Sequence, residues 1–262
     1  INKMKICVFM SNNFDFSQEI QKSSYKDLSL IINYDYSIHN EYEFIYYKPY
    51  LLNSNENNNC LNKKNGMIKK KKWSEILSGK KVMEEDVEYF VFISENGIFK
   101  DKHFKIEKII EKDKEKNIIF MNKGGNICKD FYICKVSDKM RSFFEKWYDL
   151  KDMENDLAGL LKDEEINYGL IQENLFLENA NLLKFCGDNE NKYDYFIKYI
   201  ANNGINYKEL AKEIKKNEKV YNTREEVKIE KKISILIGTP CFGAQVSCNY
   251  TKSLIKVKEI CE

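Results

Sequence analysis

The chain has 262 residues, of which 43% are hydrophobic and 13% aromatic, and its formal net charge is only +2. This composition indicates a globular protein, and the near balance of acids and bases argues against a partner selected by charge, such as nucleic acid. Eight cysteines without a Cys-x-x-Cys pair, and two histidines far apart in the sequence (His39 and His103), argue against a zinc site. With no secretory signal and no apolar run near the ~20 residues of a membrane span, we expect a cytoplasmic protein with reduced thiols.

The first fifty residues predict a strand, a helix and a second strand. Residues 5–10 (K-I-C-V-F-M) form an apolar run typical of a buried strand, and the polar residues Ser11 and Asn12 follow it. We expect a helix over residues 17–34 and a strand over residues 43–48, which a proline ends because it lacks a backbone donor. This order is the beginning of an α/β fold.

Asparagine and lysine dominate residues 52–72, where we expect a flexible loop. Such a segment cannot bury enough apolar area to offset the entropy lost on ordering it. Its basic run, residues 69–72, could still contact phosphate. Trp73 heads a short amphipathic helix, since Ile76 and Leu77 follow it at helical spacing.

Residues 89–101 (Y-F-V-F-I-S-E-N-G-I-F-K-D) are the most informative stretch of the chain. The first five form an unbroken aromatic and β-branched run, which is typical of a strand covered on both faces. Ser94, Glu95 and Asn96 then end this strand with oxygen-bearing side chains. Ligands of open α/β sheets bind at the carboxyl ends of strands, so residues 94–97, here named the elbow, are a candidate site. The same residue types also suit an ordinary turn.

The middle of the chain continues the α/β pattern. We expect a helix over residues 104–112, strands over residues 117–121 and 131–136, and a helix over residues 137–149. In the last of these, Ser137 is a suitable N-cap, because its hydroxyl can accept from an amide of the first turn. The apolar residues that recur at helical spacing predict its core face: Met140, Phe143, Phe144 and Trp147.

The last third predicts one further strand and two helices before the domain ends. Residues 170–179 have a helical pattern, residues 182–185 suit a strand, and Asn206 with Glu209 resembles a capping box that opens a helix. We expect a first domain over residues 1–214, a charged linker over 215–232, and over 233–262 the start of a second, truncated domain. The fresh strand, loop and helix after the linker favour a truncated domain over an extra strand of the first.

In this order the segments resemble the GT-A-fold nucleotide-sugar glycosyltransferases, particularly the galactosyl/mannosyltransferase-like proteins of large DNA viruses and algae. The resemblance covers about residues 5–187. Separately, the final segment of the chain, residues 235–250, is similar to the first strand and loop of another glycosyltransferase domain. The first resemblance is carried by the following segments: residues 33–47, Trp73-Ser74, 89–101, 131–148 and Gln172-Glu173. The implied fold is α/β and GT-A-like (Rossmann-like), with a mixed, mainly parallel sheet flanked by helices.

The resemblance also implies a site. The family holds Mn²⁺ or Mg²⁺ with an Asp-x-Asp motif at a strand end, because hard oxygen ligands and a divalent cation stabilise the departing diphosphate. In this chain the two aspartates fall on Ser94 and Asn96, which leaves Glu95 and Asn96 as the metal ligands. Glu173, beside Gln172, is the implied catalytic base for the acceptor hydroxyl. The implied nucleotide-sugar-binding residues are Ser11, Asn12, Trp73, Ser94, Glu95 and Asn96.

Two functions remain open from the sequence. The first is a glycosyltransferase that transfers a sugar from a nucleotide-sugar donor to a glycan or protein acceptor. It would belong to a multidomain viral glycosylation protein in the host cytoplasm, with a downstream glycosyltransferase domain as partner. The alternative is a catalytically inactive GT-A-like scaffold or sugar-binding module, which the degenerate Asp-x-Asp motif favours. A lysine-rich nucleic-acid binder is disfavoured because such proteins usually carry a basic domain.

Overall fold

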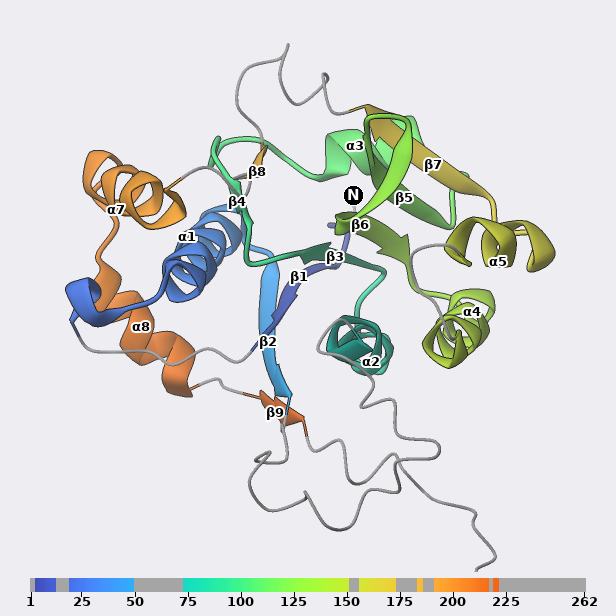
Figure 1. Ribbon diagram of the computed structural model, residues 1–262, viewed down its shortest axis with the longest axis horizontal. Helices are drawn as coiled ribbons and strands as arrows, with labels where there is room; N and C mark the ends of the chain where they lie inside the picture. Colours follow the sequence, from blue (N-terminus) through green and yellow to red (C-terminus); the bar gives the residue numbers. More distant parts are fainter. Residues whose placement is uncertain are drawn as a thin grey trace, which may run out of the picture. The chain divides into compact units, whose positions relative to one another are not determined.

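A computed structural model gives the structure of the protein (Figure 1). It describes residues 3–12, 19–49, 73–150, 156–172, 183–185, 191–216 and 219–221. All of these belong to one compact unit, Ile1–Glu226. The predicted second domain, residues 233–262, lies outside the described residues and stays a prediction.

The core of this unit is a seven-stranded sheet with the order β7-β5-β6-β3-β1-β2-β9. Its strands are β1 (Ile6–Ser11), β2 (Glu43–Pro49), β3 (Tyr89–Ile93), β5 (Ile118–Lys123), β6 (Asn126–Lys135), β7 (Tyr168–Gln172) and β9 (Lys219–Tyr221). The pairs β1–β2, β1–β3, β2–β9 and β5–β7 are parallel, whereas β6 is antiparallel to both β3 and β5. A second sheet pairs β4 (Gly97–Phe99) with β8 (Leu183–Phe185).

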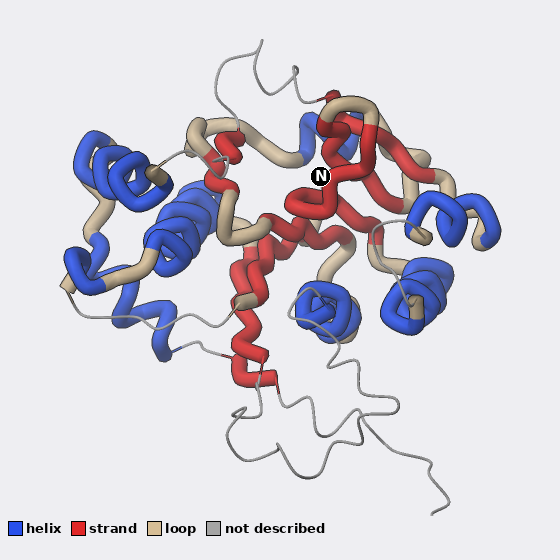
Figure 2. Tube along the Cα trace, in the orientation of Figure 1, coloured by secondary structure: helices blue, strands red, loops and turns tan. Residues whose placement is uncertain are grey.

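Helices cover both faces of the large sheet, as Figure 2 shows. They are α1 (Tyr25–Asn40), α2 (Trp73–Val82), α3 (Glu107–Lys112), α4 (Asp138–Asp149), α5 (Leu157–Asp163), α7 (Lys192–Asn202) and α8 (Tyr207–Lys216), with a short 3-10 turn at Ile20–Lys22. Side chains of α1, α7 and α8 share one hydrophobic cluster, and those of α2, α4 and α5 share another. Within the described residues no helix is long and apolar enough to cross a bilayer.

The central strands alternate between these two clusters. In β1, Val8 and Met10 pack on the α1 face, whereas Cys7 and Phe9 pack on the α2 face. The same alternation divides β3, so each face of that strand is buried. This double burial explains why the run at residues 89–93 is apolar without interruption rather than at every second position. The sequence prediction of a strand covered on both faces is therefore confirmed.

Two predicted helices differ from the structure. The first begins at Tyr25 rather than at residue 17, because Ser24 and Asp27 form a reciprocal capping box that fixes its start. We expected a helical segment over residues 170–179, but residues 170–172 belong to strand β7, which pairs with β5. There the buried Ile171 alternates with the exposed Leu170, a period of two that a helix would not produce.

The described part of the predicted linker is also regular structure. Lys215 and Lys216 end α8, and Lys219–Tyr221 forms β9, which pairs with β2. In contrast, the helix at Asp138–Asp149 has the expected N-cap, since the Ser137 hydroxyl accepts from the amide of Met140 at 3.3 Å. Its expected core residues are all buried. Half of the predicted capping box of α8 is present, since Asn206 Oδ1 accepts from the Glu209 amide at 3.4 Å. The Glu209 carboxylate accepts from the Asn206 side-chain amide at 2.7 Å rather than from a backbone amide.

Candidate functional site

The carboxyl ends of β1 and β3 form the topological switch point of the sheet. From β1 the chain passes through α1 to β2 on one side, and from β2 it passes through α2 to β3 on the other side of β1. Helices α1 and α2 cover opposite faces of the sheet. The chain leaves β1 toward β2 and leaves β3 toward β5 and β6, on the opposite side, so the two connections part between the ends of β1 and β3. Open α/β sheets bind their ligands at such a point.

Three of the residues predicted from the sequence meet there, and all three are buried: Ser11, Asn12 and Ser94. The pairing of β1 with β3 ends with Phe9 opposite Phe92, so Ser11, Asn12 and Ser94 all follow within three residues of this last pair, at the same edge of the sheet. The Ser11 hydroxyl accepts from that of Ser78 on α2 at 2.9 Å, which holds this helix against the end of β1.

The elbow itself is a tight turn. The amide of Gly97 donates to the carbonyl of Ser94 at 3.0 Å, and the amide of Asn96 donates to the Ser94 hydroxyl at 3.3 Å. The Ser94 amide donates to the carbonyl of Asp130 at 2.8 Å, so β6 fixes the start of the turn. The turn interpretation and the site interpretation of these residues are therefore compatible, since the turn determines where Glu95 and Asn96 lie.

Two lysines contact the elbow. Lys192, the first residue of α7, donates to Asn96 Oδ1 at 2.8 Å. Lys26, in the first turn of α1, lies with its Nζ 3.9 Å from Glu95 Oε1. Sequence reasoning missed both lysines, because the contacts join residues far apart in the chain and no local pattern signals them.

Helix α1 fixes the strand that leaves the elbow. The Asn33 side-chain amide donates to the carbonyl of Gly97 at 3.0 Å, and its Oδ1 accepts from the amide of Phe99 at 3.0 Å. The Asn33 side chain thus pairs with the backbone carbonyl and amide of β4 as a neighbouring strand would. Ser29, one turn earlier, donates to the same Gly97 carbonyl at 2.7 Å. The sequence does contain a signal for this pair, namely two polar residues at i and i+4 within an otherwise apolar helix segment.

Helix α7 holds the next residues of the same segment. The Tyr199 hydroxyl donates to the carbonyl of Lys100 at 2.8 Å. Burial raises the pKa of Tyr199 to about 12, so this hydroxyl keeps its proton and remains a donor at neutral pH. The elbow is therefore supported on both sides of its exit, by α1 and by α7, which favours a fixed geometry of Glu95 and Asn96.

The remaining predicted site residues are placed less fully. Trp73 is the first residue of α2, and its side chain lies outside the described residues. Gln172 ends β7 opposite Asn122 of β5, at the same edge of the sheet as the elbow. Since β5 and β6 lie between β7 and β3, Gln172 is about 14 Å from the end of β3 at the usual strand spacing. Glu173 lies outside the described residues.

The implied metal does not fit the side chains at the elbow. Of the three side chains there, only Glu95 is a carboxylate, and both Glu95 and Asn96 are engaged by lysines. Hard divalent cations need several oxygen ligands, and a neighbouring ammonium group competes for them. In the described part of the chain, no group of three His, Cys, Asp or Glu side chains could hold a metal.

The two histidines, distant in sequence, are neighbours in the structure. His39 Nε2 lies 3.2 Å from His103 Nδ1, because the carboxyl end of α1 packs beside the loop that follows β4. The sequence argument from their separation was therefore wrong about their positions. Within the described residues, no third side chain of the kinds above joins them in a group that could hold a metal.

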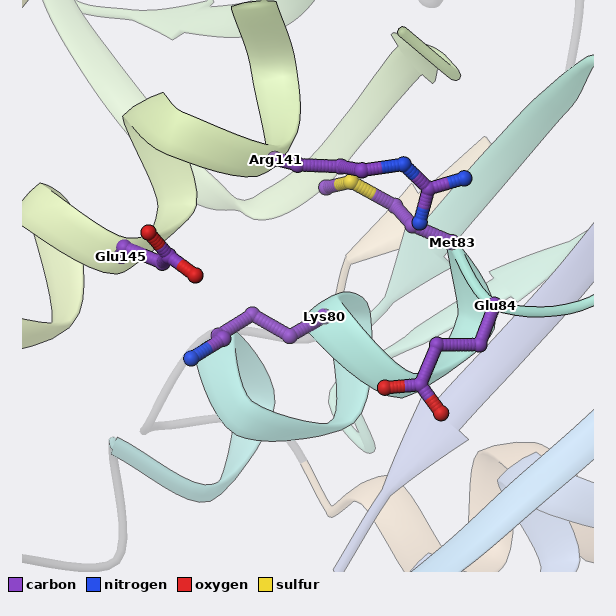
Figure 3. Close-up of a pocket in the computed structure, with 5 residues that line it drawn as sticks. All are labelled: Lys80, Met83, Glu84, Arg141 and Glu145. Carbon is purple, nitrogen blue, oxygen red and sulfur yellow. The ribbon is translucent and has the colours of Figure 1, made fainter. Parts of the chain in front are cut away.

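A small pocket lies at the opposite edge of the sheet (Figure 3). It has a volume of about 110 Å³ and is lined by Lys80, Met83, Glu84, Arg141 and Glu145. These residues come from the end of α2, the segment after it and the start of α4, all near the amino ends of the strands. The volume is below the roughly 300 Å³ of typical ligand pockets, so we do not assign a substrate to it.

No protein-family model matches the chain, and no curated protein matches it. Among solved structures, the chain is similar to a glycosyltransferase involved in the glycosylation of the major capsid of PBCV-1. The TM-score is 0.53 and the identity 11%, over 74% of this chain and 99% of that chain. It is also similar to the glycosyltransferase GlyE of Streptococcus pneumoniae TIGR4, with a TM-score of 0.45 and 9% identity over 81% of this chain and 63% of that chain.

A third similar structure is HddC from Yersinia pseudotuberculosis, with a TM-score of 0.44 and 12% identity over 75% of this chain and 100% of that chain. At these identities a likeness concerns the fold alone, and of the three structures only the first has a TM-score above 0.5. The predicted fold class is confirmed: the chain has the α/β, GT-A-like fold of a nucleotide-sugar transferase, with a mixed, mostly parallel sheet flanked by helices.

Proposed function

We propose that the protein transfers a sugar from a nucleotide-sugar donor to a glycan or protein acceptor. The observation that carries this proposal is the meeting of Ser11, Asn12 and the elbow at the switch point between β1 and β3. Nucleotides of doubly wound sheets bind at this point. The likeness of the fold to a glycosyltransferase supports the same function.

In the proposed reaction, the bond between the anomeric carbon of the sugar and the terminal phosphate oxygen of the donor breaks. The nucleoside diphosphate leaves with the bonding electrons, and the acceptor oxygen forms the new bond to the anomeric carbon. Glu173, beside Gln172, takes the proton of the acceptor hydroxyl. The position of Gln172 at the carboxyl edge of the sheet supports this role.

Donor binding is the direct test. UDP-, GDP-, ADP- and CMP-sugars are titrated into the full chain, and thermal unfolding and calorimetry are followed with and without Mn²⁺. At least one donor is expected to stabilise the protein, by about 2.7 kcal/mol when its concentration is 100 times Kd. We expect Trp73→Ala to weaken this binding and Lys80→Ala, at the amino edge of the sheet, to leave it unchanged. The absence of any response to every nucleotide would contradict the proposal.

The catalytic role of Glu173 has a separate test. Glu173→Gln keeps the size of the side chain and removes its basicity, so it is expected to lower turnover roughly 10²- to 10⁴-fold. Donor affinity should not change, since the carboxylate contacts the acceptor and not the donor. Equal losses in turnover and in donor affinity would place Glu173 in the donor site instead.

An inactive scaffold or sugar-binding module is the second candidate. It is favoured by the elbow, where Glu95 is the single carboxylate among the three polar side chains. This candidate predicts that the protein binds glycans or a partner domain but neither hydrolyses nor transfers the sugar of any donor. Release of nucleoside diphosphate by the purified chain, abolished in Glu173→Gln, would exclude it.

We further propose that the chain works in a multidomain viral glycosylation protein in the host cytoplasm, beside a glycosyltransferase-like domain that begins at residues 233–262. The proposal is supported by the similarity to a glycosyltransferase described as involved in capsid glycosylation. Expression of the longer reading frame, followed by limited proteolysis near residues 222–232, is expected to release two folded fragments. A single fragment resistant at this position would contradict the domain boundary.

A further inference from the structure

The side chains around the elbow form a compact charged group, here named the elbow cluster: Tyr25, Lys26, Glu95, Asn96 and Lys192. Besides the contacts to Asn96 and Glu95, the two ammonium groups lie over the same ring. Lys192 Nζ is 5.2 Å and Lys26 Nζ 5.9 Å from the centre of Tyr25. The two positive charges are therefore within about 11 Å of each other, beside one aromatic ring.

Counted over its five side chains alone, the cluster has more positive than negative charge. It has two ammonium groups, one carboxylate and one neutral amide, and the Lys192 contacts described are with the amide and the ring, both neutral. Asp27 and Asp194, in the first turns of the same helices, are engaged in capping bonds with Ser24 and Asn191. The side chains of Lys26 and Glu95 are only 26% and 17% exposed, so water screens their charges less than at an open surface.

Both lysines lie where helix energetics disfavour them. Lys192 is the first residue of α7 and Lys26 the second residue of α1. The amino end of a helix carries a partial positive charge. A cation in the first turn therefore slightly destabilises the helix, whereas the same cation in the last turn would stabilise it. Both helices have a lysine at this unfavourable position, and both lysine side chains contact the same elbow. This indicates that the positive charge has a function that outweighs its cost to helix stability.

We propose that Lys26 and Lys192 bind the diphosphate of the nucleotide-sugar donor and replace the divalent cation at this elbow. The inference rests on the proposed function. An ammonium group has three donors, and Lys192 uses one of them on Asn96, which leaves two for phosphate oxygens. When the sugar leaves the donor, negative charge grows on the diphosphate, and two fixed cations stabilise it without a metal. Glu95 and Asn96 are positioning residues that orient the two lysines.

The test is calorimetric titration of UDP, GDP and inorganic pyrophosphate into the full chain, in EDTA and in Mn²⁺. Binding is expected in EDTA, with less than about a twofold gain from Mn²⁺. Lys26→Ala and Lys192→Ala are each expected to weaken binding roughly 10- to 100-fold, the range of a lost charge-assisted hydrogen bond. Lys80→Ala, with the same change of charge at the amino edge, is the matched control and should bind as the wild type does.

A second readout separates binding from a merely structural role. Alanine is a better first-turn residue than a cation, so Lys192→Ala is expected to unfold within a few degrees of the wild type or above it while its binding weakens. A lower unfolding temperature with unchanged affinity would identify Lys192 as structural and overturn the inference.

The outcomes also separate this inference from the proposed function. Nucleotide binding that requires Mn²⁺, or binding in EDTA that both lysine variants retain, overturns the inference and leaves the glycosyltransferase proposal in place. A wild-type chain that binds no nucleoside diphosphate under either condition overturns both. Loss of binding in the two lysine variants with retention in Lys80→Ala supports both.

Discussion

The interaction of Asn33 with β4 gives the sharpest prediction of the structure. Asn33 is fully buried, and its side chain bonds both the carbonyl of Gly97 and the amide of Phe99. Asn33→Leu keeps the approximate volume but leaves the Phe99 amide without its acceptor, at a cost of about 1–3 kcal/mol for a buried unsatisfied donor. The Gly97 carbonyl still accepts from Ser29, so losing the bond from Asn33 to this carbonyl costs less, about 0.5–1.5 kcal/mol. The expected total is about 2–4 kcal/mol.

Two further variants form a graded series with Asn33→Leu. Ser29→Ala removes one of two donors to Gly97 and is expected to cost about 1 kcal/mol. Ser37→Ala is the matched control, since the Ser37 hydroxyl donates only within its own helix, to the carbonyl of Asn33 at 2.8 Å. The double variant of Asn33 and Ser29 leaves the Gly97 carbonyl with neither donor, so its cost should exceed the sum of the two single costs.

Urea unfolding measures the free energies, and hydrogen exchange locates the effect. Exchange at the Phe99 amide should accelerate more than at the amides of β1 if the local bond is lost. An Asn33→Leu cost below about 1 kcal/mol, or one equal to that of Ser37→Ala, would refute the reasoning that α1 acts as a strand partner of β4. So would a double variant whose cost is simply additive.

Three further predictions concern packing and charge. In Gly79→Ala the new Cβ would lie 2.7 Å from Phe144, so we expect the free energy of unfolding, measured in urea, to fall by about 1–3 kcal/mol. In Gly159→Ala the new Cβ would have no atom within 4 Å, so this variant should be neutral or stabilising. Burial raises the pKa of Asp35 above its ordinary value, so the charged carboxylate opposes folding. Asp35→Asn should therefore stabilise the protein at pH 7. This gain in stability should vanish as the pH falls below the pKa of the carboxyl in the unfolded chain, near 4. Equal gains at pH 7 and pH 3 would contradict this. The buried Tyr132 hydroxyl has no hydrogen-bond partner within the described residues, so Tyr132→Phe should unfold at the same urea concentration or a higher one; a loss above 1 kcal/mol would imply a partner.

The sequence predicted where strand β3 ends better than it predicted which side chains contact the elbow. It identified the elbow from a buried aromatic strand that stops at polar residues, and β3 ends at the expected residue. It did not identify what stands against the elbow, because Lys26 and Lys192 reach it from α1 and α7 across long sequence separations.

Local signals therefore determined the α/β order, the strand β3, the core face of α4 and the caps of α4 and α8, since each depends on residues within one or two turns. Only the tertiary structure decided the remainder. The strand at Tyr168–Gln172 is short and lies at the edge of the sheet, and its pairing with β5 outweighs a weak local pattern. The bonds of Asn33 to β4 and of Lys192 to Asn96 join segments more than sixty residues apart. Periodicity reports what a segment buries, whereas the partner of a buried polar group depends on where the fold brings another segment of the chain.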